Sequence, residues 1–242
     1  MTEYTIPLAL YDFVPVVFTG VALFWVTRMV AFVCSEMGRT VAIGAALVVA
    51  GGTAKATWKL IMAASGSAVD VRWLDNSLFI FMAPGFLLLA FGVWGMTRIV
   101  RRLSSTPARV LRPLSVALTL AGATLLAVLL PGSPAWSRLL LGVMVPAALA
   151  LNVLFVIFAV RERLAWATAL LLANLGGTLV LNWMARLPEQ TIPLQWAAQT
   201  VNSVTWLAFA VAAHLVYAHT RARFGVDAQA EACALAASTE MT

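Results

Sequence analysis

Long segments without any charged side chain are the feature that most constrains this chain. Five of them contain no Asp, Glu, Lys or Arg: 76–97, 113–137, 139–160, 164–185 and 190–220. A helix needs roughly 20 apolar residues to cross the ~30 Å hydrocarbon core of a bilayer. Of the 242 residues, 62% are hydrophobic and 11% charged, which leaves too little polar surface for a soluble domain. We therefore predict an all-α polytopic membrane protein, which excludes soluble catalytic domains, nucleic-acid binders and secreted disulfide scaffolds.

The same length criterion divides the chain into seven predicted transmembrane helices. They are expected near 9–33, 40–64, 76–97, 113–131, 137–160, 164–186 and 194–219. Turn-forming residues separate them, as in the expected turn at 35–38. Residues 1–222 should thus form one membrane domain, and the polar segment 223–242 a disordered cytoplasmic tail. No basic segment precedes the first apolar run, so we expect a retained helix and not a signal peptide.

Arginine is distributed unevenly between the two sides of the predicted spans. Eleven arginines flank one side: Arg28, Arg39, Arg98, Arg101, Arg102, Arg109, Arg112, Arg161, Arg163, Arg221 and Arg223. Three flank the other: Arg72, Arg138 and Arg186. Because arginine beside short loops stays in the cytoplasm, the N-terminus is predicted outside and the C-terminus inside. These arginines also account for the net charge of +6, so the expected partner is a lipid bilayer, a bacterial inner (plasma) membrane, and not nucleic acid.

Two parts of the sequence resemble each other at an offset of 125 residues. The glycine pair Gly51-Gly52 is followed by Trp58, and the pair Gly176-Gly177 is followed at the same spacing by Trp183. This match predicts that 9–97 and 137–219 are copies of one three-helix unit, with 113–131 as a linker helix. Since three helices and a linker restore the original direction, the two copies would run parallel.

A 3+1+3 arrangement with an outside N-terminus resembles the SWEET and PQ-loop class of sugar transporters. In that class a Trp from the second helix and an Asn from the third helix of each unit contribute to a central sugar site. The resemblance implies that Trp58 with Asn76, and Trp183 with Gln199 or Asn202, are site residues. The Pro-Gln dipeptide of the class is absent from the first helix of either half.

Polar side chains within the spans define the candidate site, because polar groups in hydrocarbon usually face a bundle interior or a water-filled cavity. Lys55 and Lys59 lie one turn apart on the second span, with Trp58 on nearly the same face. Asp12 and Asp75 stand near the outer ends of spans 1 and 3. Further polar or aromatic residues recur on the third, sixth and seventh spans: Asn76, Asn174, Thr178, Asn182, Trp183, Gln199, Asn202 and Trp206. This set predicts an outward-opening cavity for a hydroxylated or anionic small solute.

Structural explanations stand beside this functional one. Lys59 could extend to the headgroups, and Lys55 could form a structural bridge with Asp12 or Asp75. The two tryptophans that follow the glycine pairs, Trp58 and Trp183, suit an interfacial belt. The polar stripe on the sixth span and both glycine pairs would also serve helix packing alone.

The favoured function is a small-solute facilitator in which two three-helix bundles rock about a site between them. One alternative is a non-transporting sensor or assembly subunit. Another is an intramembrane lipid enzyme that uses Lys55 and Asp75 as acid and base. An opsin is disfavoured because the seventh span has no lysine for a Schiff base. No cofactor or metal is expected, since His214 and His219 have no Cys or carboxylate at ligand spacing.

Overall fold

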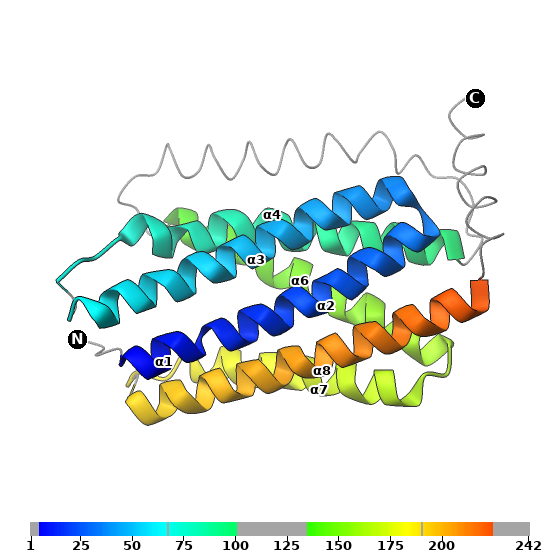
Figure 1. The fold of residues 1–242 in the computed structure, drawn as a ribbon. Helices are drawn as coiled ribbons and strands as arrows, with labels where there is room; N and C mark the ends of the chain where they lie inside the picture. The colour runs from blue at the N-terminus through cyan, green and yellow to red at the C-terminus, as the bar shows by residue number, and fades with distance from the viewer. Residues whose placement is uncertain (1–4, 67, 101–134, 190, 225–242) are drawn as a thin grey trace.

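The computed structural model describes residues 5–66, 68–100, 135–189 and 191–224, and this part of the chain is helical throughout its length apart from short connections. Its helices are α1 (Ile6–Tyr11), α2 (Phe13–Val33), α3 (Ser35–Ala64), α4 (Arg72–Val100), α6 (Ala135–Arg161), α7 (Ala165–Met184) and α8 (Ile192–Phe224). The long helices run side by side along one direction (Figure 1).

Six helical stretches of the described chain are long and apolar enough to cross a membrane. They are Ile6–Val33, Ser35–Ala64, Arg72–Val100, Leu139–Arg161, Ala165–Met184 and Ile192–Arg223. By length and composition they support an integral membrane protein, and they coincide with six of the seven spans expected from sequence. The seventh expected span, 113–131, lies outside the described residues, as does 225–242 of the expected tail.

The boundary between the first two spans differs from the prediction. The expected turn at 35–38 is wrong, because α3 already begins at Ser35 and the chain reverses at the single extended residue Cys34 (φ −153°, ψ 114°). The reason is a close contact between the two helices. A Cβ added to Gly38 would lie 2.4 Å from the Cβ of Ala31, so only glycine lets the first turn of α3 lie on the last turns of α2.

The described helices pack in chain order around a common core. Each of α2, α3, α4, α6, α7 and α8 contacts the next one in this series, and α8 returns to contact α2. Buried apolar side chains from all of them join in one cluster. Within it Phe155 of α6 meets Phe209 of α8 edge to face, with ring centroids 5.5 Å apart. The closed series brings the beginning and the end of the described chain into contact.

Two glycines set the distance between α3 and α4. A Cβ on Gly44 would lie 2.8 Å from the carbonyl oxygen of Gly85, and a Cβ on Gly85 would lie 2.9 Å from that of Gly44. Small residues at such crossings allow two backbones to approach closely in a membrane. This contact fixes α3 against α4 and thereby places Lys55 beside Asp75.

The short break between α1 and α2 contains a buried carboxylate, that of Asp12. Pro15 has no N–H, and its ring clashes with the carbonyl of the residue four positions earlier, Tyr11. The helix is interrupted at Asp12, between the end of α1 at Tyr11 and the start of α2 at Phe13. Asp12 is buried, with 5% of its surface exposed. Asp12 itself keeps right-handed helical angles (φ −59°, ψ −21°), and its N–H donates to the carbonyl oxygen of Leu8. The first span thus continues through the break, with the carboxylate of Asp12 on the face toward the bundle interior.

Candidate functional site

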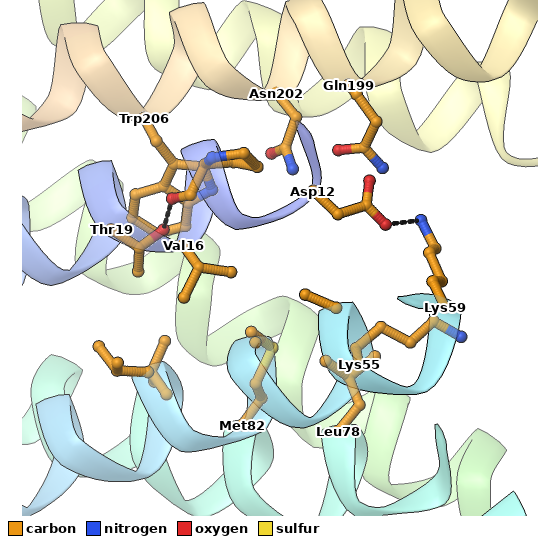
Figure 2. A pocket seen from close by; sticks show the side chains of 15 residues that line it. Asp12, Val16, Thr19, Lys55, Lys59, Leu78, Met82, Gln199, Asn202 and Trp206 are labelled. Atoms are coloured by element: carbon orange, nitrogen blue, oxygen red, sulfur yellow. Dashed lines mark hydrogen bonds and ion pairs between the residues drawn. The ribbon is translucent and has the colours of Figure 1, made fainter. Parts of the chain in front are cut away.

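A cavity of about 140 Å³ lies between α2, α3, α4 and α8 (Figure 2). It begins at the end of the bundle that contains Asp12, which we call the Asp12 end. Its lining residues are Asp12, Pro15, Val16, Thr19, Val48, Val49, Gly52, Lys55, Ala56, Lys59, Leu78, Met82, Gln199, Asn202 and Trp206. Three of the four walls come from the N-terminal half and the fourth, α8, from the C-terminal half. Five of the twelve residues expected at the site therefore line one cavity.

The Asp12 carboxylate forms an ion pair across the cavity wall. Its Oδ2 lies 2.5 Å from Nζ of Lys59, and the Lys59 side chain is 16% exposed. Its other oxygen, Oδ1, is buried without a hydrogen-bond partner in the described structure. Lys59 therefore does not extend to the headgroups as one sequence interpretation held, because its ammonium is directed at Asp12.

The second lysine belongs to a network at the rim of the cavity. Lys55 forms an ion pair with Asp75 of α4, and the two side chains are 31% and 34% exposed. The predicted pairing of Lys55 with one of the two aspartates is thus confirmed for Asp75. The ammonium of Lys55 also lies 4.4 Å from the ring centroid of Trp58, a favourable cation–π geometry. Trp58 itself does not line the cavity.

Asp70 extends this network into the α3–α4 turn. Its Oδ2 accepts a hydrogen bond of 2.7 Å from Nε of Arg72, and its Oδ1 accepts one of 3.2 Å from the indole Nε1 of Trp58. The hydrogen bond from the Arg72 guanidinium, with the weaker one from Trp58, holds the pKa of the Asp70 carboxyl below its usual range. Trp58 therefore donates a hydrogen bond to Asp70 of the α3–α4 turn, and its ring contacts the ammonium group of Lys55.

The opposite wall of the cavity carries amides. Gln199 and Asn202 project from α8 toward the Asp12 side, and the ring of Trp206 closes the wall next to them (Figure 2). Trp206 is held edge to face against Phe209, with centroids 5.7 Å apart. The cavity lining thus combines the Asp12–Lys59 pair, Lys55, two amides and an aromatic ring with the apolar side chains of Val16, Leu78 and Met82. Asp75, the partner of Lys55, does not line the cavity.

The polar stripe of α7 lies elsewhere. Asn174 is buried and its Nδ2 donates a 2.9 Å hydrogen bond to the backbone oxygen of Thr205 on α8. Thr178 and Asn182 each donate to a backbone oxygen four residues earlier on α7. Asn182 is exposed and Trp183 is 63% exposed. These residues do not line the cavity, and the Asn174 contact supports the helix-packing interpretation of the stripe. Asn76 of α4 is likewise exposed and outside the lining.

The two glycine pairs of the apparent repeat have different surroundings. A Cβ on Gly51 would lie 3.0 Å from Met82 of α4, whereas a Cβ on Gly176 would meet nothing within 4 Å. On α7 the close contact falls one residue later, because a Cβ on Gly177 would lie 2.2 Å from Oγ1 of Thr205. The contact that Gly51 makes with α4 therefore has its counterpart at Gly177 and not at Gly176.

A second charged cluster lies at the other end of the bundle and was missed in the sequence. Glu162, just after α6, lies 3.1 Å from Nε2 of His219 on α8 and forms an ion pair with Arg223. We call this the Glu162 end. Glu162 lies 57 and 61 positions from its two partners in the chain, and no local spacing reveals the contact. The sequence offers no carboxylate at ligand spacing from His219, and the fold supplies Glu162 from a distant segment. No group of three potential metal ligands occurs among the described residues.

Comparison of the chain with protein-family models, with curated proteins and with solved structures gives no match.

Proposed function

We propose that this chain is a membrane facilitator for a small polar solute, and that the solute binds in the cavity between α2, α3, α4 and α8. The observation that carries the proposal is that residues from both halves of the chain line the cavity. Lys55 and Lys59 come from the N-terminal half, and Gln199, Asn202 and Trp206 from the C-terminal half. A relative movement of the two halves would change such a cavity, as alternating access requires.

The chemistry of the lining also favours a ligand over simple packing. Charged side chains within hydrocarbon are costly and commonly mark a solute or ion pathway. Helix packing is served here by Gly38, Gly44 and Gly85 and by the Asn174 hydrogen bond, and none of these residues lines the cavity. The lining instead leaves polar groups around an open volume. This contrast favours transport over the alternative of a sensor or assembly subunit.

The proposal includes seven crossings. Leu140 and Met144, near the start of α6, pack beside Phe79 and Ala83, near the start of α4. The end of α6 leads to Glu162, which contacts the end of α8. The two helices α4 and α6 thus run in the same direction, which supports the proposal of an odd number of crossings between them. The expected span at 113–131 would supply one crossing.

The proposed orientation places the Glu162 end in the cytoplasm of a cell whose plasma membrane holds the protein. In the described chain, arginines at or near the Glu162 end include Arg28, Arg39, Arg98, Arg161, Arg163, Arg221 and Arg223, against Arg72 and Arg186 near the other end. Arginine beside short loops favours the cytoplasm. The cavity would then begin at the outer side of the membrane.

The parallel repeat and the SWEET or PQ-loop analogy stay part of the proposal. In such a repeat α2, α3 and α4 correspond to α6, α7 and α8. The contact between α2 and α8 then corresponds to the contact between α6 and α4, and both contacts are present. The same correspondence relates α3–α4 packing to α7–α8 packing. The shifted glycine contact at Gly177 argues that any such repeat has diverged in register.

The test is solute flux through purified protein in lipid vesicles. Asn202→Ala removes an amide from the cavity, and Asn182→Ala removes the same group from an exposed face of α7. We expect flux of a small neutral solute such as urea or glycerol in the parent protein, a large loss in Asn202→Ala, and little change in Asn182→Ala. Flux equal to that of protein-free vesicles for all solutes would refute the facilitator.

A further inference from the structure

The buried oxygen Oδ1 of Asp12 is the least satisfied group of the cavity. It is one of two buried side-chain oxygens without a hydrogen-bond partner in the described chain; the other, on Asn152 of α6, does not line this cavity. Leaving a buried acceptor unsatisfied costs roughly 1–3 kcal/mol, and more when the group is charged. An occupant that donates a hydrogen bond would remove this cost.

The charges around the cavity are already balanced. Lys59 is paired with Asp12, and Lys55 with Asp75, so two ammonium groups face two carboxylates. Among the described residues around the cavity, each ammonium group is already matched by a carboxylate, and the unsatisfied atom is itself a carboxylate oxygen, which repels an anion. A cation would be repelled by these ammonium groups as the paired carboxylates attract it, so the neutral pairs offer it little net attraction in return for its lost hydration. A neutral molecule avoids both penalties.

The wall of the cavity formed by α8, opposite the lysines, supplies further hydrogen-bonding groups and an aromatic ring. The amides of Gln199 and Asn202 point toward the Asp12 side of the cavity (Figure 2). Each amide can both donate and accept hydrogen bonds, and the Trp206 ring offers an apolar face. The volume of about 140 Å³ holds several water-sized groups, at ~10–15 Å³ each. These features fit a compact solute with polar groups at one edge.

From these observations we infer that the cavity binds a small neutral solute through a hydroxyl or amide N–H that donates to Oδ1 of Asp12. This inference rests on the proposed facilitator and names its solute class. It replaces the broader expectation of a hydroxylated or anionic solute by the neutral donor alone. Asp12 is then a binding residue, with Lys59 as the residue that holds its carboxylate in place.

The experiment compares two double variants that both lack the ion pair. Asp12→Asn with Lys59→Met keeps an acceptor oxygen in the cavity, whereas Asp12→Leu with Lys59→Met removes it. Replacing a buried ion pair by apolar groups is often tolerated, so both variants are first checked for folding by their thermal unfolding in detergent. Flux of urea, glycerol, potassium nitrate with valinomycin, and tetramethylammonium chloride is then measured in vesicles, together with osmotic water permeability.

We expect the parent protein to carry urea or glycerol and not the two ions. The Leu/Met variant, which has no acceptor at this position, should lose about tenfold or more of the parent flux. The Asn/Met variant also lacks the carboxylate, but its amide oxygen still accepts a hydrogen bond, so it should lose clearly less flux than the Leu/Met variant. Equal loss in both variants would show that Asp12 serves only as a structural ion-pair partner and would overturn the inference.

Other outcomes separate this inference from the proposed function. Carriage of nitrate or tetramethylammonium in place of urea and glycerol would overturn the neutral class and leave the facilitator standing. A change in water permeability alone would identify the occupant as water and overturn the solute site. Absence of flux for every solute in the parent protein would overturn the proposed function itself.

Discussion

Asp12 of the first span and Lys59 of the second lie 47 positions apart in the sequence, and their charged atoms are 2.5 Å apart inside the bundle. Both side chains are largely buried, at 5% and 16% exposure. The contact exists because Asp12 lies on the inward face of the first span, and because α3 packs against α1 and α2 at the same end. The rotation of the first span and a helix contact together place a charge pair inside the bundle.

The first prediction concerns the energy of this pair. Lys59→Met leaves the Asp12 carboxylate buried without its counter-charge, which costs about 3–5 kcal/mol in comparable buried pairs. Adding Asp12→Asn removes the stranded charge and should restore most of the lost stability. The free energy of unfolding, measured by denaturant titration in mixed micelles, checks both effects. A double variant as unstable as Lys59→Met alone would contradict this account of the pair.

The second prediction uses Lys55 as a matched comparison on the same helix. Its ion pair with Asp75 is about one third exposed on both sides, so water can take over the charge when either partner is removed. Lys55→Met should therefore cost no more than ~1 kcal/mol, well below the loss for Lys59→Met. The same unfolding titration measures both. Equal losses for the two lysines would show that exposure does not govern these pairs.

The sequence predicted the helices well and the contacts between them only in part. Long apolar segments determine where a chain can cross a membrane, and six of the expected spans are helical in the structure. The turn at Cys34 could not be found, because it depends on the contact between Gly38 and Ala31, which belongs to tertiary packing. A turn signal at 35–38 is overridden when two helices can approach so closely.

The candidate site shows the same division. Lys55 could be matched with Asp75, because α3 and α4 are neighbours joined by a short turn. Helical spacing placed Asn174, Thr178 and Asn182 on one face of α7, but it does not state which neighbour that face meets. The rotation of α7 against α8 is set by Gly177 and Thr205. The sequence therefore grouped these residues on one face and left a site and helix packing both open, and the hydrogen bond of Asn174 to Thr205 favours packing.

The third prediction tests that rotation with two adjacent glycines. Gly176→Ala places a methyl group in open space and should raise stability by up to about 1 kcal/mol, because alanine favours helix over glycine. Gly177→Ala drives a methyl group into the buried side chain of Thr205 and should cost about 1–3 kcal/mol. Unfolding titrations of the two variants give the comparison. A reversed order would mean that the other face of α7 meets α8.

The fourth prediction concerns orientation. Ala68 lies in the α3–α4 turn at the Asp12 end, and Ala165 begins α7 at the Glu162 end; both are exposed. In a background where Cys34 and Cys233 are replaced by Ser, we expect Ala68→Cys to react with a membrane-impermeant thiol reagent in intact cells. Ala165→Cys should react only after permeabilisation, since the arginine-rich end is expected inside. The opposite labelling pattern would invert the proposed topology.

The last prediction follows from the hydrogen bonds of Asp70, which hold its pKa below the usual range. A carboxyl with a lowered pKa in the folded protein favours folding above its unfolded pKa, near 3.9, and loses that contribution as pH falls through the folded value. Protonation weakens the hydrogen bond that the indole of Trp58 donates to Asp70. The indole N–H resonance of Trp58 in the NMR spectrum of the micellar protein should therefore shift with a midpoint below the usual pKa of aspartate.

In Arg72→Gln the guanidinium, which is the main cause of the lowered pKa, is absent, and the midpoint should move up. A midpoint unchanged by this substitution would assign the lowered pKa to another group, and a resonance that does not titrate would show that Trp58 is not bonded to Asp70.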